Sequence, residues 1–275
     1  MFVKVLMEDL EVNNGLQFEH GFSVYVETKK NKILVDTGKS ELTWSNAEKL
    51  NIDLNKIEKV FLSHGHYDHS GGLLSLAKLN PNAKIYMHEK ANGDYYSIHD
   101  GKEKYIGIDK EISNLKNINL INSEIKIDDE ISIFTNASGR REWPQSNLIL
   151  KKKIDGKLEQ DDFIHEMYVV IEEDKKTVLI SGCAHNGILN ILDRFKEVYN
   201  KMPDVVISGF HMMKKDDYTD EEIETIKNIA SELSESDTKF YTGHCTSMKA
   251  YDLMKPILKD KIEYINAGSK IKVGE

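Results

Sequence analysis

Short apolar and β-branched runs, separated by polar turns, dominate the first third of the chain. Alternating or continuously apolar runs of four to six residues are typical of strands, whereas apolar residues at helical spacing predict helices. Strands followed by short helices are the expected order here. The predicted strands are residues 3–7, 22–27, 32–35, 59–63 and 83–88, and the predicted helices are residues 43–50 and 73–79.

The second half of the chain alternates more regularly between strand and helix patterns. A strand pair joined by a charged turn is followed by helices and strands in turn, an order that indicates α/β layering. Residues 89–165 are less regular, with β-like runs at 118–121, 131–134 and 148–152, and we expect substrate-contacting loops there. The predicted strands are residues 167–171, 177–181, 205–208 and 239–242, and the predicted helices are residues 188–199, 220–233 and 247–258.

Length and composition indicate one soluble domain. The chain has 275 residues, of which 40% are hydrophobic and 30% charged, and no linker-like segment interrupts it, so we expect a single domain over residues 1–275. Its first residues do not form a secretory signal, and no apolar run approaches the roughly 18 residues that span a bilayer. Two cysteines, Cys183 and Cys245, suit a reducing compartment. These features predict a cytoplasmic location without membrane anchoring.

The charge balance narrows the class of ligand. A net charge of -9 repels phosphate polymers, which argues against nucleic acid as a partner. A small anionic molecule remains possible, because a bound metal ion outweighs the global field locally. We therefore expect a small-molecule substrate, while the oligomeric state is left open.

Several potential metal ligands are closely spaced in the segment from Ser63 to Gly72, which reads Ser-His-Gly-His-Tyr-Asp-His-Ser-Gly-Gly. It places His64, His66, Asp68 and His69 just after a predicted buried strand. Imidazole and carboxylate groups suit zinc and similar divalent metals. A solvated polar loop is the simpler alternative, but four ligand-type side chains in six residues favour a metal site.

This segment resembles the HxHxDH signature of the metallo-β-lactamase superfamily. Within that superfamily, the chain is similar to a dihydropteroate synthase-like subgroup of metallo-hydrolases, whose named relative is an archaeal synthase that joins a dihydropterin to a ribofuranosyl-aminobenzene phosphate. Besides the signature, the segments that carry the resemblance are residues 19–21, 33–38, 181–188, 209–211 and 243–246.

The resemblance implies an α/β fold of the αββα four-layer sandwich type, with metals at one edge between two sheets. His64 and His66 would bind one ion, and Asp68 and His69 a second. His244, which follows a strand near the end of the chain, fits the last histidine of the superfamily. Two divalent ions are implied. Zinc is the metal we expect, and iron or manganese would also suit these ligands.

The third histidine of the superfamily pattern is harder to place. The position of the usual bridging aspartate is taken by Cys183, which can bind as a thiolate or pack as a small hydrophobe. His185 lies two residues further on, and we assign it as a ligand. His165 and Glu166 are the alternatives.

Two further assignments concern residues around the centre. His211 follows a strand, and we predict that it contacts an anionic substrate group with help from Lys214 or Lys215, although an ordinary loop histidine remains an alternative. Asp36 is expected to orient a ligand or the end of a strand. No spacing argument singles out His20, so a surface or core histidine is the default.

The resulting functional hypothesis is a metal-dependent hydrolase that acts on a small phosphorylated or ester-containing metabolite. Metal-bound water would be the nucleophile, and Asp68 would orient it or handle its proton. A bond-forming pterin-related synthase or transferase, and a metal-containing binding module without turnover, are the alternatives.

Overall fold

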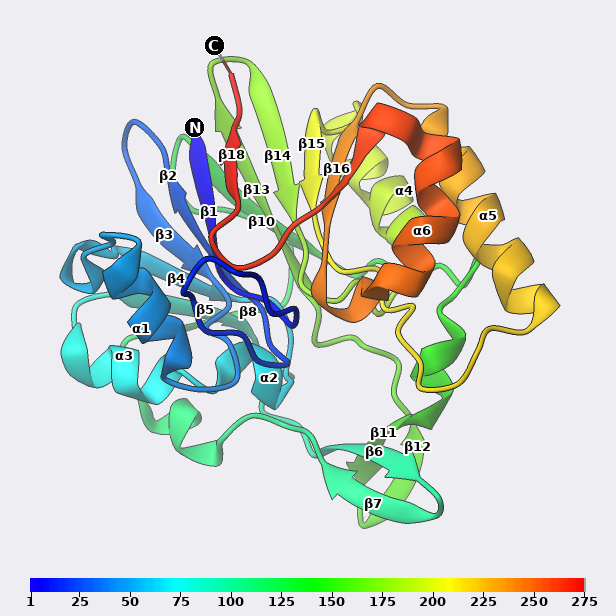
Figure 1. The fold of residues 1–275 in the computed structure, drawn as a ribbon. Helices are drawn as coiled ribbons and strands as arrows, with labels where there is room; N and C mark the ends of the chain where they lie inside the picture. The colour runs from blue at the N-terminus through cyan, green and yellow to red at the C-terminus, as the bar shows by residue number, and fades with distance from the viewer. Residues whose placement is uncertain (275) are drawn as a thin grey trace.

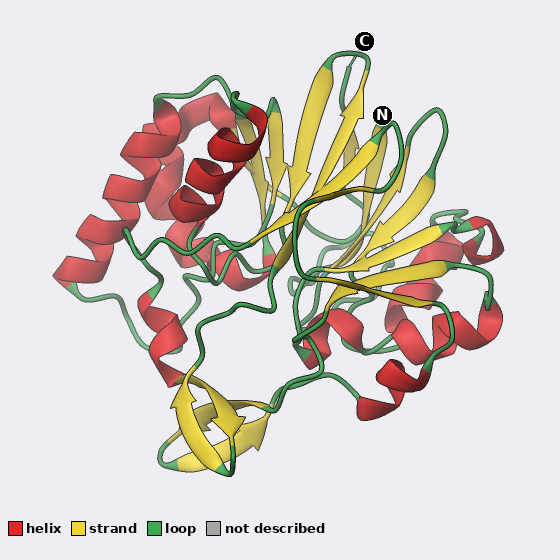
Figure 2. Cartoon of the chain, turned by 180° about the vertical axis from the view of Figure 1, so that it is seen from behind, coloured by secondary structure: helices red, strands yellow, loops and turns green. Residues whose placement is uncertain are grey.

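The computed structural model describes residues 1–274, which form two facing β-sheets with helices on both outer sides (Figure 1). Seen from behind, the helices fall into two groups that flank the strands (Figure 2). The first sheet contains, in order, β18 (Lys270–Lys272), β1 (Phe2–Met7), β2 (Ser23–Glu27), β3 (Lys32–Val35), β4 (Lys59–Leu62), β5 (Lys84–His88) and β8 (Ile118–Ile121).

The second sheet mirrors the first in having a parallel part and an antiparallel part. Its strands are, in order, β17 (Ile262–Tyr264), β16 (Lys239–Thr242), β15 (Val205–Ile207), β14 (Lys176–Ile180), β13 (Met167–Glu173), β10 (Ile131–Thr135) and β9 (Ile125–Lys126). β14 to β17 run parallel, as do β3, β4, β5 and β8 in the first sheet. Parallel neighbours need crossover connections, and helices supply several of them.

Helices cover the outer face of each sheet. One apolar cluster lies between the two sheets, and further clusters lie beneath each helical layer, so apolar side chains fill every interface of the αββα sandwich. The predicted fold class is thereby confirmed. The first sheet is covered by α1 (Leu42–Lys49) and α3 (Leu73–Leu79), and the second by α4 (Ile188–Tyr199), α5 (Asp220–Ser234) and α6 (Ser247–Leu258).

Shorter turns of helix connect these elements. The short helix α2 (Tyr67–Ser70) lies within the histidine-rich segment. The 3-10 turns are η1 (Leu54–Lys56), η2 (Lys110–Asn114), η3 (Gln145–Ile149), η4 (His244–Thr246) and η5 (Lys259–Lys261). Within residues 1–274, no helix combines the length and apolarity needed to cross a membrane.

A small third sheet occupies the region where the sequence pattern was weakest. It lies below the sandwich in Figure 1, and has its own apolar cluster built from Tyr95, Ile106, Leu150 and Phe163. The strands of this third sheet are, in order, β12 (Lys157–Gln160), β11 (Leu150–Ile154), β6 (Tyr95–His99) and β7 (Lys102–Tyr105). The strand predicted over residues 148–152 is wrong at its start, because residues 148 and 149 belong to η3.

The two ends of the described chain meet in the first sheet. β1 pairs antiparallel with β18, with Val3 opposite Ile271. On its other side, β1 pairs antiparallel with β2. The N-terminal strand is therefore held between a sequence neighbour and a strand from the opposite end of the chain.

Truncation of Phe195 on α4 tests how strongly the outer helical layer is packed. Its side chain is fully buried among Phe134 and Tyr199. We expect Phe195→Ala to lower the free energy of unfolding by about 3–5 kcal/mol, because it leaves a cavity beneath the helix. Leu120→Ala, on a side chain that is 60% exposed, is the control and should change it by under about 0.5 kcal/mol. Urea unfolding measures both, and equal effects would contradict the packing described.

Candidate metal centre

The ends of strands from both sheets converge on one cluster of polar side chains. Asp36 follows β3, and the segment beginning with His64 follows β4. From the second sheet, Cys183 follows β14, His211 follows β15 and His244 follows β16. Parallel strands place their carboxyl ends at a common edge, so side chains far apart in sequence meet there.

One group of candidate ligands consists of His64, His66 and His185. The Nε2 atoms of His64 and His185 lie 3.3 Å apart, and both side chains are buried. The ring of His66 lies 4.6 Å from that of His64 and 4.8 Å from that of His185, between ring centres. His64 and His66, predicted to bind one ion, therefore lie beside His185, which was assigned as a ligand of either ion.

A second group surrounds the carboxylate of Asp68. Its Oδ2 atom lies 3.4 Å from His244 Nε2 and 3.7 Å from His69 Nε2. Cys183 Sγ lies 3.2 Å from His69 Nε2. The thiol belongs both to a cluster with His64 and His185 and to a cluster with His69 and His244, each with donor atoms within 4.8 Å. Cys183 thus stands between the two groups.

The orientation of the rings leaves their Nε2 lone pairs facing the cluster. His64 Nδ1 lies 2.9 Å from the hydroxyl of Ser63, which donates to Asp36 Oδ2 at 2.7 Å. His185 Nδ1 lies 2.9 Å from Asn147 Oδ1. Because each Nδ1 faces an acceptor, each carries the ring proton, and two Nε2 lone pairs face each other at 3.3 Å.

The same arrangement recurs in the second group. His69 Nδ1 lies 2.6 Å from Asp36 Oδ2, so Asp36 orients the ring of a candidate ligand. His244 Nδ1 lies 2.6 Å from Asp9 Oδ1. Carboxylates bonded to the remote nitrogen of a metal-binding histidine fix its ring and raise its basicity.

The distances fit a divalent metal ion. Nitrogen ligands of tetrahedral zinc lie about 2.0–2.1 Å from the ion, so two of them are about 3.3 Å apart. The separations of 3.3 Å and 3.4 Å agree with that spacing. In addition, the Nε2 atoms of His66 and His244 are buried and have no hydrogen-bond partner within residues 1–274. Such atoms normally have a partner, and a cation would supply one.

The two groups differ in charge. Burial, reinforced by neighbouring imidazoles, lowers the pKa of His64 and His185 well below the usual value and that of His66 to about 3. These rings are therefore neutral near pH 7, the form that binds a metal. In the second group, Asp36 and Asp68 outweigh burial and raise the pKa of His69. The carboxylates thus make this group favourable for positive charge.

The alternative ligands named from the sequence have other contacts. Gly65 N donates to His165 Nδ1 at 3.0 Å, and His165 Nε2 lies 3.1 Å from Asp161. Glu166 accepts from the backbone N–H groups of His185, at 2.6 Å, and Asn186, at 3.0 Å. Both residues therefore hold the loops that carry the candidate ligands, and His165 also forms with His66 and Asp161 a cluster whose donor atoms lie within 4.8 Å.

His211 lies at the edge of the first group, partly exposed. Its ring centre is 4.0 Å from that of His185, and its donor atom lies within 4.8 Å of the thiols of Cys183 and Cys245. Lys214, the expected helper, instead binds both oxygens of Glu222 at 2.8 and 2.9 Å. His211 therefore lies near the centre and Lys214 is paired with Glu222, while the contact of His211 with a substrate stays a prediction.

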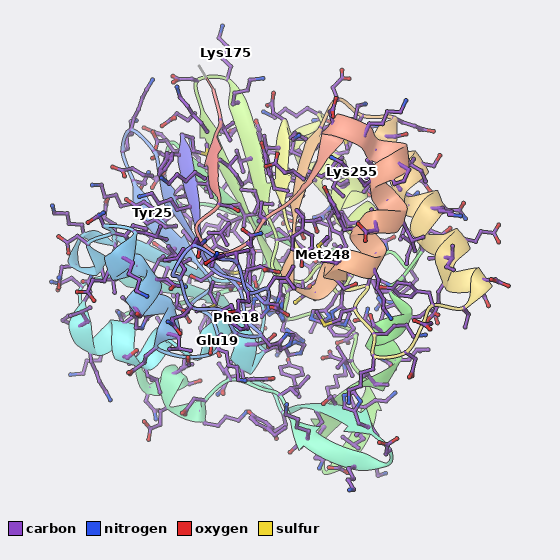
Figure 3. The ribbon with its side chains drawn as sticks, viewed as in Figure 1. Phe18, Glu19, Tyr25, Lys175, Met248 and Lys255 are labelled. Carbon is purple, nitrogen blue, oxygen red and sulfur yellow. The ribbon has the colours of Figure 1, made fainter. Side chains whose placement is uncertain are left out.

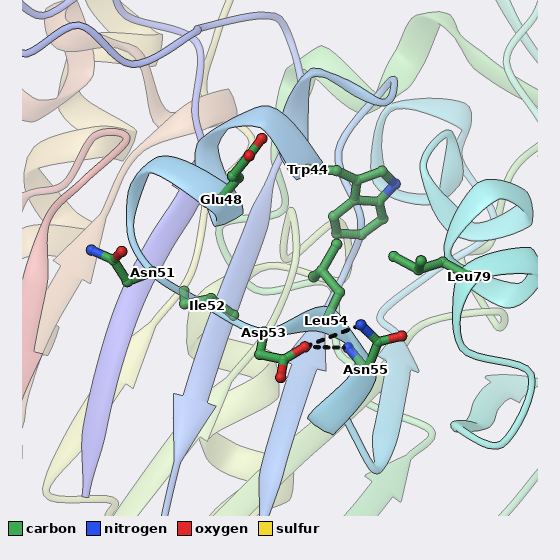
Figure 4. A pocket seen from close by; sticks show the side chains of 8 residues that line it. All are labelled: Trp44, Glu48, Asn51, Ile52, Asp53, Leu54, Asn55 and Leu79. Atoms are coloured by element: carbon green, nitrogen blue, oxygen red, sulfur yellow. Dashed lines mark hydrogen bonds between the residues drawn. The ribbon is translucent and has the colours of Figure 1, made fainter.

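A separate surface groove lies beside α1 and η1 (Figure 4). It has a volume of about 450 Å³ and is lined by Trp44, Glu48, Asn51, Ile52, Asp53, Leu54, Asn55 and Leu79. The carboxylate of Asp53 accepts from Asn55 there, which caps η1. Since its lining contains no histidine or cysteine, the groove is separate from the metal chemistry.

Sequence reasoning missed the residues that join the ligand loops from outside. Ser63, Asn147 and Asp9 each contact a ligand histidine, yet no local motif marks them. His20 was assigned by default to the surface or core, but its Nε2 lies 3.4 Å from Asp68 Oδ2. The one sequence feature that could have pointed to His20 is that residues 19–21 are among the segments that carry the resemblance to the superfamily subgroup.

Comparison with known proteins establishes the class. The sequence model of the Metallo-beta-lactamase superfamily matches residues 16–222. The chain belongs to this superfamily, as the resemblance of the histidine segment implied. Its clustered histidine, cysteine and aspartate side chains provide the ligand types that such a fold uses for divalent metals.

Particular relatives cover nearly the whole chain. Two come from Methanocaldococcus jannaschii: the protein MJ0448 is 30% identical over 90% of this chain and 91% of its own, and 7,8-dihydropterin-6-methyl-4-(beta-D-ribofuranosyl)-aminobenzene-5'-phosphate synthase is 28% identical over 94% and 92%. The solved structure of Tm1679, described as a metal-dependent hydrolase of the beta-lactamase superfamily, has a TM-score of 0.83 and 32% identity over 100% of both chains.

A more distant structure shows the fold alone. Zn(2+)-bound PqqB from Methylobacterium extorquens has a TM-score of 0.59 and 11% identity, covering 99% of this chain and all of its own. It confirms that the αββα arrangement is shared well beyond recognisable sequence similarity.

Loss of one imidazole should remove metal without unfolding the chain. We expect His66→Ala to bind fewer divalent ions per chain than the wild type, because it deletes a donor whose Nε2 has no other use in residues 1–274. Elemental analysis after native purification measures the loss, with circular dichroism as the check on folding. His99→Ala, at an exposed position of β6, is the matched control. Unchanged metal content in His66→Ala would refute the assignment.

Removal of the charge on Asp36 should weaken metal binding indirectly. Its oxygens bond to His69 Nδ1 and to Ser63, which in turn contacts His64. We expect Asp36→Asn to lower metal affinity by about 10- to 100-fold, as for other residues that orient a ligand. Competition with a chromophoric chelator measures the affinity. Asp129→Asn, at an exposed carboxylate, should bind as the wild type does.

Proposed function

We propose that the protein is a metal-dependent hydrolase that acts on a small phosphorylated or ester-containing metabolite. The observation that carries the proposal is the pair of ligand groups that meet at Cys183, each with histidine Nε2 atoms directed inward. In this assignment, one ion is held by His64, His66 and His185. The other is held by Asp68, His69 and His244, with Cys183 between them.

When bound, the ions would supply a water nucleophile at neutral pH and polarise a phosphoryl or carbonyl oxygen. The chain's own groups define where that chemistry takes place. Although burial opposes ionisation, His69 and His244 hold the pKa of Asp68 well below its ordinary value. Asp68 is therefore an anion, and it would accept a hydrogen bond from the attacking group and so orient it.

Cationic side chains next to the centre favour an anionic substrate. Lys104, on β7 of the small sheet, lies 3.4 Å from the hydroxyl of Tyr67, which precedes Asp68. Arg140 lies 3.4 Å from Asn186, which follows His185, and its guanidinium lies over the ring of Trp143. Both cations are exposed and adjoin ligand segments, so they can meet a phosphate group that approaches from solvent.

A bond-forming synthase or transferase is the second candidate. The archaeal synthase that is 28% identical aligns with 94% of this chain, so the likeness is not confined to the metal signature. In that case the same centre would activate a phosphate-bearing partner for reaction with a pterin.

Parallel assays of the metal-loaded protein separate these functions. The protein, loaded in turn with zinc, manganese and, without oxygen, iron, would be offered phosphomonoesters, phosphodiesters, carboxylic esters, and a dihydropterin with a ribofuranosyl-aminobenzene phosphate. We expect hydrolysis of one ester class. The rate should fall by about 100-fold or more in Asp68→Asn, because Asp68 is proposed both to orient the nucleophile and to bind a metal ion. His99→Ala should retain the wild-type rate.

The other outcomes contradict the hydrolase. Product formation from the pterin mixture without ester cleavage would favour the synthase. Full metal content without turnover of any substrate would favour a binding module.

A further inference from the structure

His20 lies outside the HxHxDH signature, yet its side chain lies next to Asp68 in the second ligand group. We propose that His20 is a further ligand of the ion assigned to Asp68, His69 and His244, and that it reaches this ion from the solvent side. The inference rests on the proposed metal centre and adds a residue to it.

One carboxylate orients two imidazoles toward the same point. Asp9 Oδ1 lies 2.6 Å from His244 Nδ1, and Asp9 Oδ2 lies 2.8 Å from His20 Nδ1. Both rings therefore donate their Nδ1 proton to Asp9 and direct Nε2 away from it. Hydrogen bonding of the remote nitrogen to a carboxylate is the usual arrangement of a metal-binding histidine, and here it occurs twice on one side chain.

The two Nε2 atoms then occupy equivalent positions around Asp68. His20 Nε2 lies 3.4 Å from Asp68 Oδ2, the same distance as His244 Nε2. Ligands of one tetrahedral zinc ion are about 3.3 Å apart, so the position of His20 meets the criterion that identified the other ligands. The rings of His20 and His244 lie 4.9 Å apart between centres, close enough to share an ion.

The backbone holds the His20 segment against the Asp68 turn. Gly21 N donates to Asp9 Oδ1 at 3.2 Å, and Phe22 N donates to the carbonyl of Asp68 at 3.3 Å. A Cβ atom on Gly21 would lie 2.8 Å from Lys39 N and 2.9 Å from Asp68 O, which leaves no room for a side chain. Glycine at this position is therefore what allows His20 to approach the centre.

Glu19, the residue before His20, also anchors the segment of residues 19–21. Glu19 accepts from the backbone N–H of Ser40 at 2.9 Å and from its hydroxyl at 2.7 Å. Figure 3 shows Phe18 and Glu19 on the near face of the molecule, close to the middle. The segment is thus anchored on both sides of His20.

Exposure distinguishes His20 from the other members of its group. Its side chain is 44% exposed, whereas those of His69 and His244 are 0% and 1% exposed. His20 therefore covers the group on its solvent side. Among the proposed ligands of this group, His20 is the residue whose substitution should disturb the core least.

Metal titration of His20→Ala tests the inference without an activity assay. Zinc affinity would be measured by chelator competition, and the visible absorption spectrum of the cobalt-substituted protein would report the ligand set of each ion. We expect one equivalent of zinc to bind as in the wild type and the other at least about tenfold more weakly, with an altered cobalt spectrum. His20→Gln and His99→Ala are the matched variants; the latter should match the wild type.

The outcomes separate this inference from the proposed function. If the wild type binds two ions and His20→Ala binds both with unchanged affinity and an unchanged cobalt spectrum, His20 is not a ligand, but the proposed hydrolase stands. If the wild type takes up no ion, both fail. If Asp9→Asn weakens one ion and His20→Ala does not, Asp9 acts through His244 alone, and the inference is overturned.

Discussion

The apolar contact between the two sheets is the constraint on which the rest of the structure depends. His64, His66, Asp68 and His69 come from a loop of the first sheet, whereas Cys183, His185 and His244 come from loops of the second. Neither sheet carries all of the candidate ligands. The buried cluster that includes Val24 and Phe61 on one sheet and Val169 and Ile180 on the other fixes their relative position. Donor distances in the centre are therefore a product of core packing, since interiors deform little.

Burial of so many polar groups is costly unless each finds a partner. The carboxylates of Asp36 and Asp9 solve part of this problem, because each bonds to the remote nitrogen of a ligand histidine. What remains is a set of inward-facing nitrogens, oxygens and one shared thiol, gathered in one place. Specific carboxylates, and not the overall negative charge of the chain, give one side of the centre its preference for cations.

The sequence predicts local features well and distant contacts poorly. The four ligands from His64 to His69 lie in one segment, and the regular alternation of the second half predicts most of its strands and helices. In contrast, β7 and β12 are exposed at every position, so they lack the alternation that marks a strand. The contact of Asp9 with His244 joins residues separated by 235 positions, which no local pattern reveals. For the same reason His20 resembled an ordinary surface histidine.

The pairing of β1 with β18 also has a consequence for biosynthesis. Because translation proceeds from the N-terminus, β1 is made well before β18, the strand that covers one of its edges. Until then the backbone N–H and C=O groups on that edge are open to association with other polypeptides. Nascent chains would therefore be most prone to aggregate before β18 leaves the ribosome, so a chaperone that shields β1 during elongation would raise the yield of folded protein.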